Sequence, residues 1–142
     1  MDIHLNLSWQ GGMQGSGHIE GEGLNTKISI PAVYGGAGTD SNPKELYVAS
    51  TAACFISTLT AIAQNKKLPL KSLSVETTAH EDKDDFAISH IAHVVLTASA
   101  TDDDKEKAKA HVATADKICA VGNLARKAGV QVSADADITI AD

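Results

Sequence analysis

The stretch that decides the fold reads GGAGTDSNPKELYVASTAACF and covers residues 35–55. Its glycines are not followed by the lysine and hydroxyl residue of a phosphate-binding loop, so we interpret them as a flexible connection. Asn42 and Pro43 predict a helix start, because asparagine caps well and proline fits the first helical position. Glu45 stands where it can complete a capping box. The helix then stays apolar on nearly every face to Ala63, which predicts a central, buried helix.

Strands and one further helix are predicted on both sides of this helix. Alternating or β-rich patterns predict strands over residues 3–9, 17–22, 24–30, 70–78, 86–98 and 130–140. Acidic residues after Thr101 open a second helix to Ile118, and residues 121–127 form a further helical turn. This order is not a regular alternation of strand and helix. It predicts one α+β domain over residues 1–142, with helices on one side of a mainly antiparallel sheet.

Composition excludes several classes of protein. The chain has 12 basic and 18 acidic residues, a net charge of −6 that argues against binding a nucleic-acid backbone. The most apolar stretch is interrupted by hydroxyl residues, and the N-terminus lacks the basic start of a signal peptide. We therefore expect a cytoplasmic protein with no membrane partner, whose two cysteines rest as thiols.

The two cysteines leave two interpretations open. Cys54 lies in the apolar part of the predicted helix, where a cysteine is commonly a small structural hydrophobe. As a nucleophile it would need help, since it lies twelve residues past the Asn42 cap, beyond the reach of its own helix dipole. Burial alone would raise the pKa of the thiol. A reactive Cys54 therefore requires a cation or a hydrogen-bond donor from elsewhere in the fold. Cys119 follows 65 residues later and meets Cys54 only if the fold allows it.

The histidines and the acidic runs do not predict a metal site. His90 and His93 have odd spacing, so on a strand they point to opposite faces, and we interpret both as solvated. The acidic runs 82–85 and 102–106 lack the spacing and the glycine of a calcium loop. We expect no metal and no organic cofactor.

Two motifs together carry a family resemblance. The first is the quoted stretch 35–55, with its glycine-rich loop, Asn-Pro and Ala-Cys-Phe. The second is ICAVGNLAR, residues 118–126, which places a second cysteine before a short helix. In this order, and with this order of elements, the chain resembles the OsmC/Ohr family of osmotically inducible and organic hydroperoxide resistance proteins.

The resemblance implies an OsmC-like fold, an intertwined homodimer and a thiol peroxidase acting on organic hydroperoxides in the oxidative stress response. Cys54 would be the peroxidatic cysteine and Cys119 the resolving one, with an external thiol or dithiol as reductant. Glu45 and Arg126, the only arginine among the basic residues, are the candidates for supporting the site.

The chain also departs from the family pattern. The organic-hydroperoxide branch has an arginine where this chain has Met13, and a glutamate where it has Lys44. These departures motivate an alternative: a dimer without peroxidase activity that binds a small apolar ligand and keeps both thiols structural. A third hypothesis is a dimer with a purely structural role.

Overall fold

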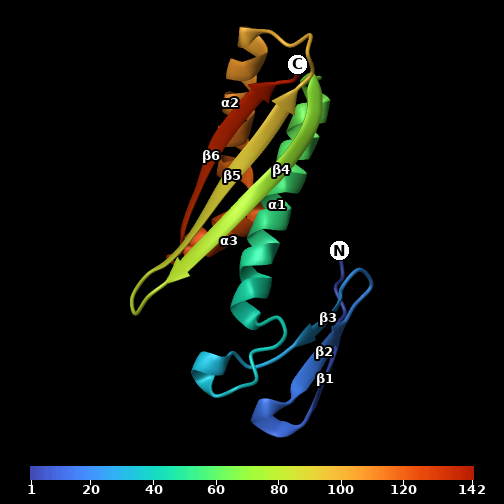
Figure 1. Ribbon diagram of the computed structural model, residues 1–142, viewed down its shortest axis with the longest axis vertical. Helices are drawn as coiled ribbons and strands as arrows, with labels where there is room; N and C mark the ends of the chain where they lie inside the picture. Colours follow the sequence, from blue (N-terminus) through green and yellow to red (C-terminus); the bar gives the residue numbers. More distant parts are fainter. The chain divides into compact units, whose positions relative to one another are not determined.

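A computed structural model describes residues 1–142, which form two compact units, Met1–Tyr47 and Val48–Asp142. The N-terminal unit is an antiparallel sheet in the order β1-β2-β3 (Figure 1). Its strands are β1 (Asn6–Gln10), β2 (Ser16–Glu20) and β3 (Asn25–Ile28), and short 3-10 turns occupy Gly12–Gln14 (η1) and Ala32–Tyr34 (η2). Gly17 is required in β2, since a Cβ there would lie 2.6 Å from the Trp9 ring.

Helix α1 (Pro43–Asn65) begins where the sequence predicts. The Asn42 side-chain oxygen accepts hydrogen bonds from the backbone N–H groups of Lys44 and Glu45, both at 3.0 Å. The Glu45 carboxylate accepts a hydrogen bond from the Ser41 hydroxyl at 2.7 Å. The cap satisfies two of the N–H groups that a helix start leaves without partners.

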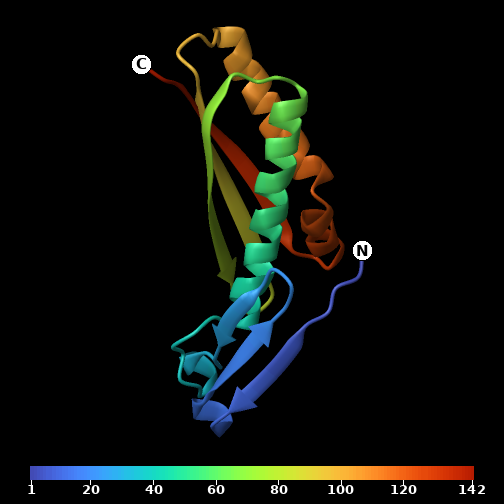
Figure 2. The ribbon, with the colours of Figure 1, turned by 90° about the vertical axis from the view of Figure 1, so that its right-hand side faces the viewer.

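The C-terminal unit packs helices on one face of a second sheet (Figure 2). Strands β4 (Leu70–Glu81) and β5 (Phe86–Leu96) are antiparallel, and β6 (Gln131–Ile140) is parallel to β5. Helices α2 (Asp102–Ile118) and α3 (Ala120–Lys127) make the connection that parallel strands need. Three of the four strand pairings are antiparallel, which confirms the α+β prediction of a mainly antiparallel sheet.

The core of this unit lies between α1, α2 and the inner face of β5. Alternate β5 residues enter it because strand side chains point to opposite faces in turn. The buried cluster comprises Phe55, Leu59, Ala92, Val94, Leu96, Ala108, Val112, Ala115 and Cys119.

Helix α1 is buried along one stripe only. Its buried residues are Thr51, Phe55, Leu59 and Ala63, one turn apart from each other. The stripe Ala49, Ala53, Ser57 and Ala61 is exposed, so the predicted burial on nearly every side is wrong for the single chain. By length and composition α1 could cross a membrane, with a mean hydropathy of 1.7 over a window that is 22% buried. A core helix of a soluble protein passes the same test.

The histidines of β5 lie on opposite faces of the sheet, as predicted. His90 is 1% exposed, so its interpretation as a solvated side chain is wrong. On the outer face, His93 Nδ1 lies 2.9 Å from an Asp137 oxygen and Nε2 lies 3.7 Å from Glu76. His90 is buried because the even-numbered residues of β5 face the helices.

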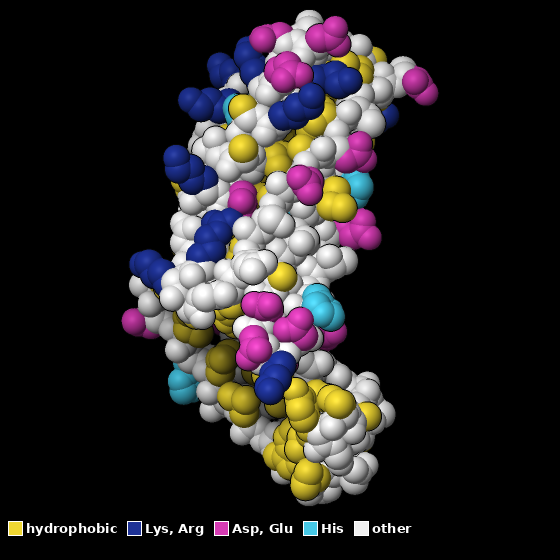
Figure 3. All heavy atoms as spheres, turned by 90° about the vertical axis from the view of Figure 1, so that its left-hand side faces the viewer, with side chains coloured by type: hydrophobic (Ala, Val, Ile, Leu, Met, Phe, Trp, Pro, Cys, Tyr) yellow, Lys and Arg dark blue, Asp and Glu magenta, His cyan; other side chains and the backbone are white.

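Exposed hydrophobic side chains concentrate in the N-terminal unit (Figure 3). Thirteen large hydrophobic side chains are exposed, and ten of them belong to Met1–Tyr47. Every residue of β1 is exposed, including Leu7 and Trp9. So much apolar surface on a small unit is typical of a surface that another molecule covers.

Candidate functional site

The fold brings Cys54 and Cys119 together. Cys54 lies half-buried in the middle of α1, while Cys119 is 2% exposed at the junction of α2 and α3. Both are free thiols, and Cys54 packs against the buried cluster that contains Cys119. Residues 65 positions apart in the sequence therefore form one pair.

The first turn of α3 supplies hydrogen-bond donors to this pair. Cys119 is the N-cap residue of α3, and its Sγ accepts a hydrogen bond from Gly122 N–H at 3.4 Å. Hydrogen bonding from the backbone N–H groups of Ala120 and Val121 lowers the pKa of the Cys54 thiol. These N–H groups have no partners inside a helix and carry the positive end of its dipole. Cys54 is thus beyond its own helix dipole but within reach of another helix N-terminus.

The two thiols have opposite acidities. Burial raises the pKa of Cys54, but hydrogen bonds from Cys119, Val121, Thr58 and Ala120 outweigh it, and the pKa is below the ordinary value. Burial raises the pKa of Cys119 to about 11, and its hydrogen bond to Cys54 adds to this. Cys54 therefore ionises first, and its thiolate holds the Cys119 proton in place.

Sequence reasoning missed three of the four donors on Cys54. Backbone N–H groups carry no residue signature, so Ala120 and Val121 could not be found from composition or spacing. Thr58 did leave a signal, because it follows Cys54 by four residues and shares its face of α1.

Arg126 binds three elements of the C-terminal unit. Its guanidinium donates to the Asp116 carboxylate at 2.7 Å and to the Asp116 backbone oxygen at 2.9 Å. It also donates to Asn123 Oδ1 at 2.9 Å and to the Val132 backbone oxygen at 3.0 Å. The side chain links the end of α2 and α3 to β6, and so fixes the helix whose first turn meets Cys54.

A buried aromatic pair includes Phe55, the residue that follows Cys54 on α1. The His90 ring stacks on Phe55, the neighbour of Cys54, with ring centroids 4.8 Å apart and planes 7° from parallel. His90 Nδ1 lies 2.8 Å from the Thr77 hydroxyl. Burial lowers the pKa of His90, although Asp116 acts in the opposite direction. The two rings pack together in the core of the C-terminal unit.

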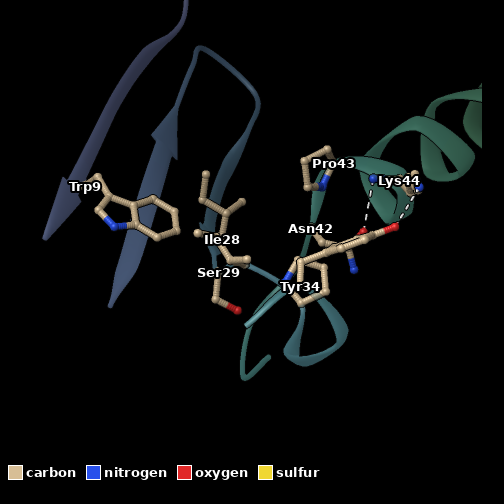
Figure 4. Close-up of a pocket in the computed structure, with 9 residues that line it drawn as sticks. Trp9, Ile28, Ser29, Tyr34, Asn42, Pro43 and Lys44 are labelled. Atoms are coloured by element: carbon tan, nitrogen blue, oxygen red, sulfur yellow. Dashed lines mark hydrogen bonds between the residues drawn. The ribbon is translucent and has the colours of Figure 1, made fainter. Parts of the chain in front are cut away.

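The N-terminal unit contains an apolar cavity of about 280 Å³ (Figure 4). Its walls include Trp9, Ile28 and Pro43, and Lys44 lies at its polar end. Lys44 Nζ donates to the Tyr34 hydroxyl at 3.2 Å and lies 5.5 Å from the centre of its ring. Met13, which stands where the hydroperoxide branch has an arginine, is exposed on η1 of the same unit. Glu45 lies in the first turn of α1, nine residues before Cys54.

Comparison with known proteins identifies the family of this chain. The family model described as OsmC-like protein matches residues 36–135. The chain belongs to the OsmC-like family. The matched residues include both cysteines and span the boundary between the two compact units.

Individual relatives agree with the family match. Bacillus subtilis YmaD is 34% identical over 122 residues, which cover 82% of this chain and 77% of YmaD. An organic hydroperoxide resistance protein of Xanthomonas axonopodis is 43% identical over 61 residues, covering 42% of this chain and 43% of that protein. The crystal structure of the Legionella pneumophila organic hydroperoxide resistance protein OsmC has a TM-score of 0.63 at 24% identity and covers 98% of this chain and 97% of that chain. The fold is thus the OsmC/Ohr type.

Proposed function

We propose that this OsmC-like protein is a thiol peroxidase that reduces organic hydroperoxides through Cys54 and Cys119. The observation that carries the proposal is that two thiols 65 residues apart meet at one buried cluster, where the pKa of Cys54 is lowered and that of Cys119 is raised. A structural cysteine buried among apolar side chains would have a raised pKa and no reason to face a second thiol. The names of hydroperoxide resistance relatives agree with this chemistry.

In the first step, the Cys54 thiolate attacks the terminal oxygen of the hydroperoxide. The O–O bond breaks, the alkoxide takes a proton from water and leaves as an alcohol, and Cys54 becomes a sulfenic acid. Two electrons pass from sulfur to the peroxide. The thiolate attacks because it is already ionised, and the amides of α3 hold it in place.

In the second step, the Cys119 sulfur attacks Cys54, and the hydroxyl of the sulfenic acid leaves as water with the Cys119 proton. Oxidation of Cys54 removes the thiolate whose charge raises the pKa of Cys119, so the resolving thiol becomes easier to ionise at this stage. An external thiol or dithiol then returns two electrons and two protons to the disulfide.

Two further residues support the site in this proposal. Arg126 acts at a distance, by holding α3 so that its first N–H groups meet Cys54. Glu45 acts on the start of α1 through Ser41. OsmC/Ohr proteins are known as dimers, and we propose that two copies of this single OsmC-like domain form the working homodimer.

Replacing each cysteine tests the proposal. We expect Cys54→Ser to abolish consumption of cumene hydroperoxide in an assay with excess dithiol, because the attacking sulfur is gone. Without external thiol, Cys119→Ser is expected to consume one equivalent of peroxide and to stop at the Cys54 sulfenic acid, which dimedone labelling and mass spectrometry detect.

The wild-type protein treated with one equivalent of peroxide provides the control. It should yield a Cys54–Cys119 disulfide and bind no dimedone. Multiple turnover by Cys54→Ser would contradict the peroxidase proposal, and absence of the disulfide in the oxidised wild type would contradict the resolving role.

The apolar cavity of the N-terminal unit favours a second candidate function, the binding of a small amphiphile. Its apolar walls suit a hydrocarbon chain, and the Lys44 ammonium at its polar end suits an anionic group. Trp9 is the only tryptophan and lines this cavity, so its fluorescence reports binding there. Titration with decanoate should change the emission with a saturable profile in the wild type and more weakly in Lys44→Met. A wild-type signal that never saturates would remove this candidate.

A further inference from the structure

The two cysteines differ in how far solvent reaches their sulfur atoms. Cys54 is half-buried in the middle of α1, whereas Cys119 is 2% exposed at the junction of α2 and α3. Cys119 is a member of the buried core cluster, and Cys54 is one of the partly buried residues packed against that cluster. A second copy of the chain can only reduce these exposures. The Cys119 sulfur is therefore inaccessible to an external reagent in one chain and in a dimer alike.

The first turn of α3 encloses the Cys119 sulfur. Cys119 is the N-cap residue of this helix, and its Sγ accepts a hydrogen bond from Gly122 N–H at 3.4 Å. A Cβ added at position 122 would lie 3.4 Å from this sulfur and 3.9 Å from a methyl carbon of Val132 on β6. A single carbon would thus already touch both neighbours. The sulfur of another molecule has no room to approach Cys119 from this side.

These surroundings make Cys119 a poor target and a good leaving atom in thiol–disulfide exchange. Exchange depends on access to the sulfur that is attacked and on the stability of the thiolate that leaves. If Cys54 is attacked, the negative charge develops on Cys119, where Gly122 N–H is in place to donate. A hydrogen bond to an ionised acceptor is about twice as strong as one to a neutral acceptor. If Cys119 is attacked, the reagent must first enter the core.

We propose that the dithiol that reduces the Cys54–Cys119 disulfide attacks the Cys54 sulfur, and that Cys119 is the leaving thiolate. The inference rests on the function proposed above, because that function supplies the disulfide. A thiolate of the reductant forms a bond to Cys54 Sγ, the S–S bond breaks, and its electron pair goes to Cys119, which takes a proton from water. The second thiol of the reductant then attacks the external sulfur of the mixed disulfide. The products are the oxidised dithiol and the Cys54 thiolate.

Trapping the first adduct in the wild-type protein tests this inference. The disulfide is formed with diamide, so that no peroxidase activity is required, and the oxidised protein is mixed briefly with glutathione. Acid and N-ethylmaleimide then stop the exchange, and mass spectrometry locates glutathione on one cysteine and maleimide on the other. We expect glutathione on Cys54 and maleimide on Cys119, with at least about a tenfold excess over the reverse pattern. The same oxidised protein in concentrated urea, where both sulfurs are exposed, is the control and should give both patterns.

The outcomes separate this inference from the peroxidase proposal. Glutathione mainly on Cys119 of the folded protein, or on both cysteines as in urea, would overturn the inference and leave the peroxidase function intact. A disulfide that diamide forms but cumene hydroperoxide does not, with glutathione on Cys54, would support the inference and overturn the peroxidase function. Failure of diamide to join Cys54 to Cys119 would overturn both the inference and the resolving role.

Discussion

At the scale of single residues, neutral contacts rather than charges control the chemistry of the C-terminal unit. Hydrogen bonding from a thiol, a hydroxyl and two backbone N–H groups, all uncharged, lowers the pKa of Cys54. His90 is buried, stacked on Phe55 and hydrogen-bonded to Thr77. A buried imidazole in this position remains neutral, because burial opposes its positive charge.

His90 gives the fold a dependence on pH. Burial lowers its pKa in the folded state, so below the unfolded value of about 6.5 the unfolded chain takes up a proton that the folded protein does not. Stability is therefore lost as pH falls through this range. We expect the stability advantage of wild type over His90→Phe, measured by urea unfolding, to be smaller at pH 5.5 than at pH 7.5.

His93 has the opposite effect on the pH dependence of stability, but it does not affect the comparison of wild type with His90→Phe. The hydrogen bond with Asp137 raises the pKa of His93, so its contribution is present at low pH and is lost as pH rises through the folded pKa. It is the same in both proteins and cancels in the difference between them. An equal stability difference at both pH values would show that His90 does not titrate as its burial requires.

At the scale of elements, the contact between α3 and α1 creates the site. Helix α3 has only eight residues, and such a short helix depends on tertiary contacts for its stability. Cys119 caps its start, and Arg126 anchors its last turn to α2 and β6. The same short helix thus serves the packing of the unit and the donors on Cys54.

Removing the Arg126 anchor should cost both stability and thiol acidity. Arg126→Met leaves the half-buried Asp116 carboxylate without its partner, and we expect the free energy of unfolding to fall by about 2 kcal/mol. The Cys54 pKa should rise, because α3 is no longer held in place.

The matched control is Lys107→Met, which removes an exposed ion pair to Asp103 on α2. It should change stability by less than about 0.5 kcal/mol. If Arg126→Met lowers the free energy of unfolding in urea no more than this control does, the Arg126 contacts do not have the structural role assigned to them.

At the scale of the whole molecule, a single chain leaves many apolar side chains uncovered. The N-terminal unit exposes ten large hydrophobic side chains, and α1 exposes the small residues Ala49, Ala53, Ser57 and Ala61. A stripe of small residues lets another helix approach closely. Both features agree with the proposed homodimer, in which the second copy would cover the face of α1 that a single chain exposes.

A bulky substitution on the exposed stripe tests this assembly. We expect wild type to sediment at twice the chain mass of 14.7 kDa, and Ala53→Trp to shift toward the mass of one chain. Lys109→Trp, on the exposed side of α2, is the control and should remain dimeric. Analytical ultracentrifugation provides the measurement, and a dimer of unchanged stability in Ala53→Trp would exclude this face of α1 from the interface.

The sequence by itself determined the order of the elements and the start of α1, and it predicted Cys54 and Cys119 as the candidate pair. Caps, alternation and short motifs are local signals, and Asn42, Pro43 and Cys54 each carry one within a few residues. Tertiary structure alone decided which groups touch Cys54, where Arg126 binds and that His90 is buried. These contacts join residues far apart in the chain, and two of the donors are backbone N–H groups that every residue except proline possesses. Packing, not residue type, therefore placed an uncharged donor set where the sequence suggested a missing cation.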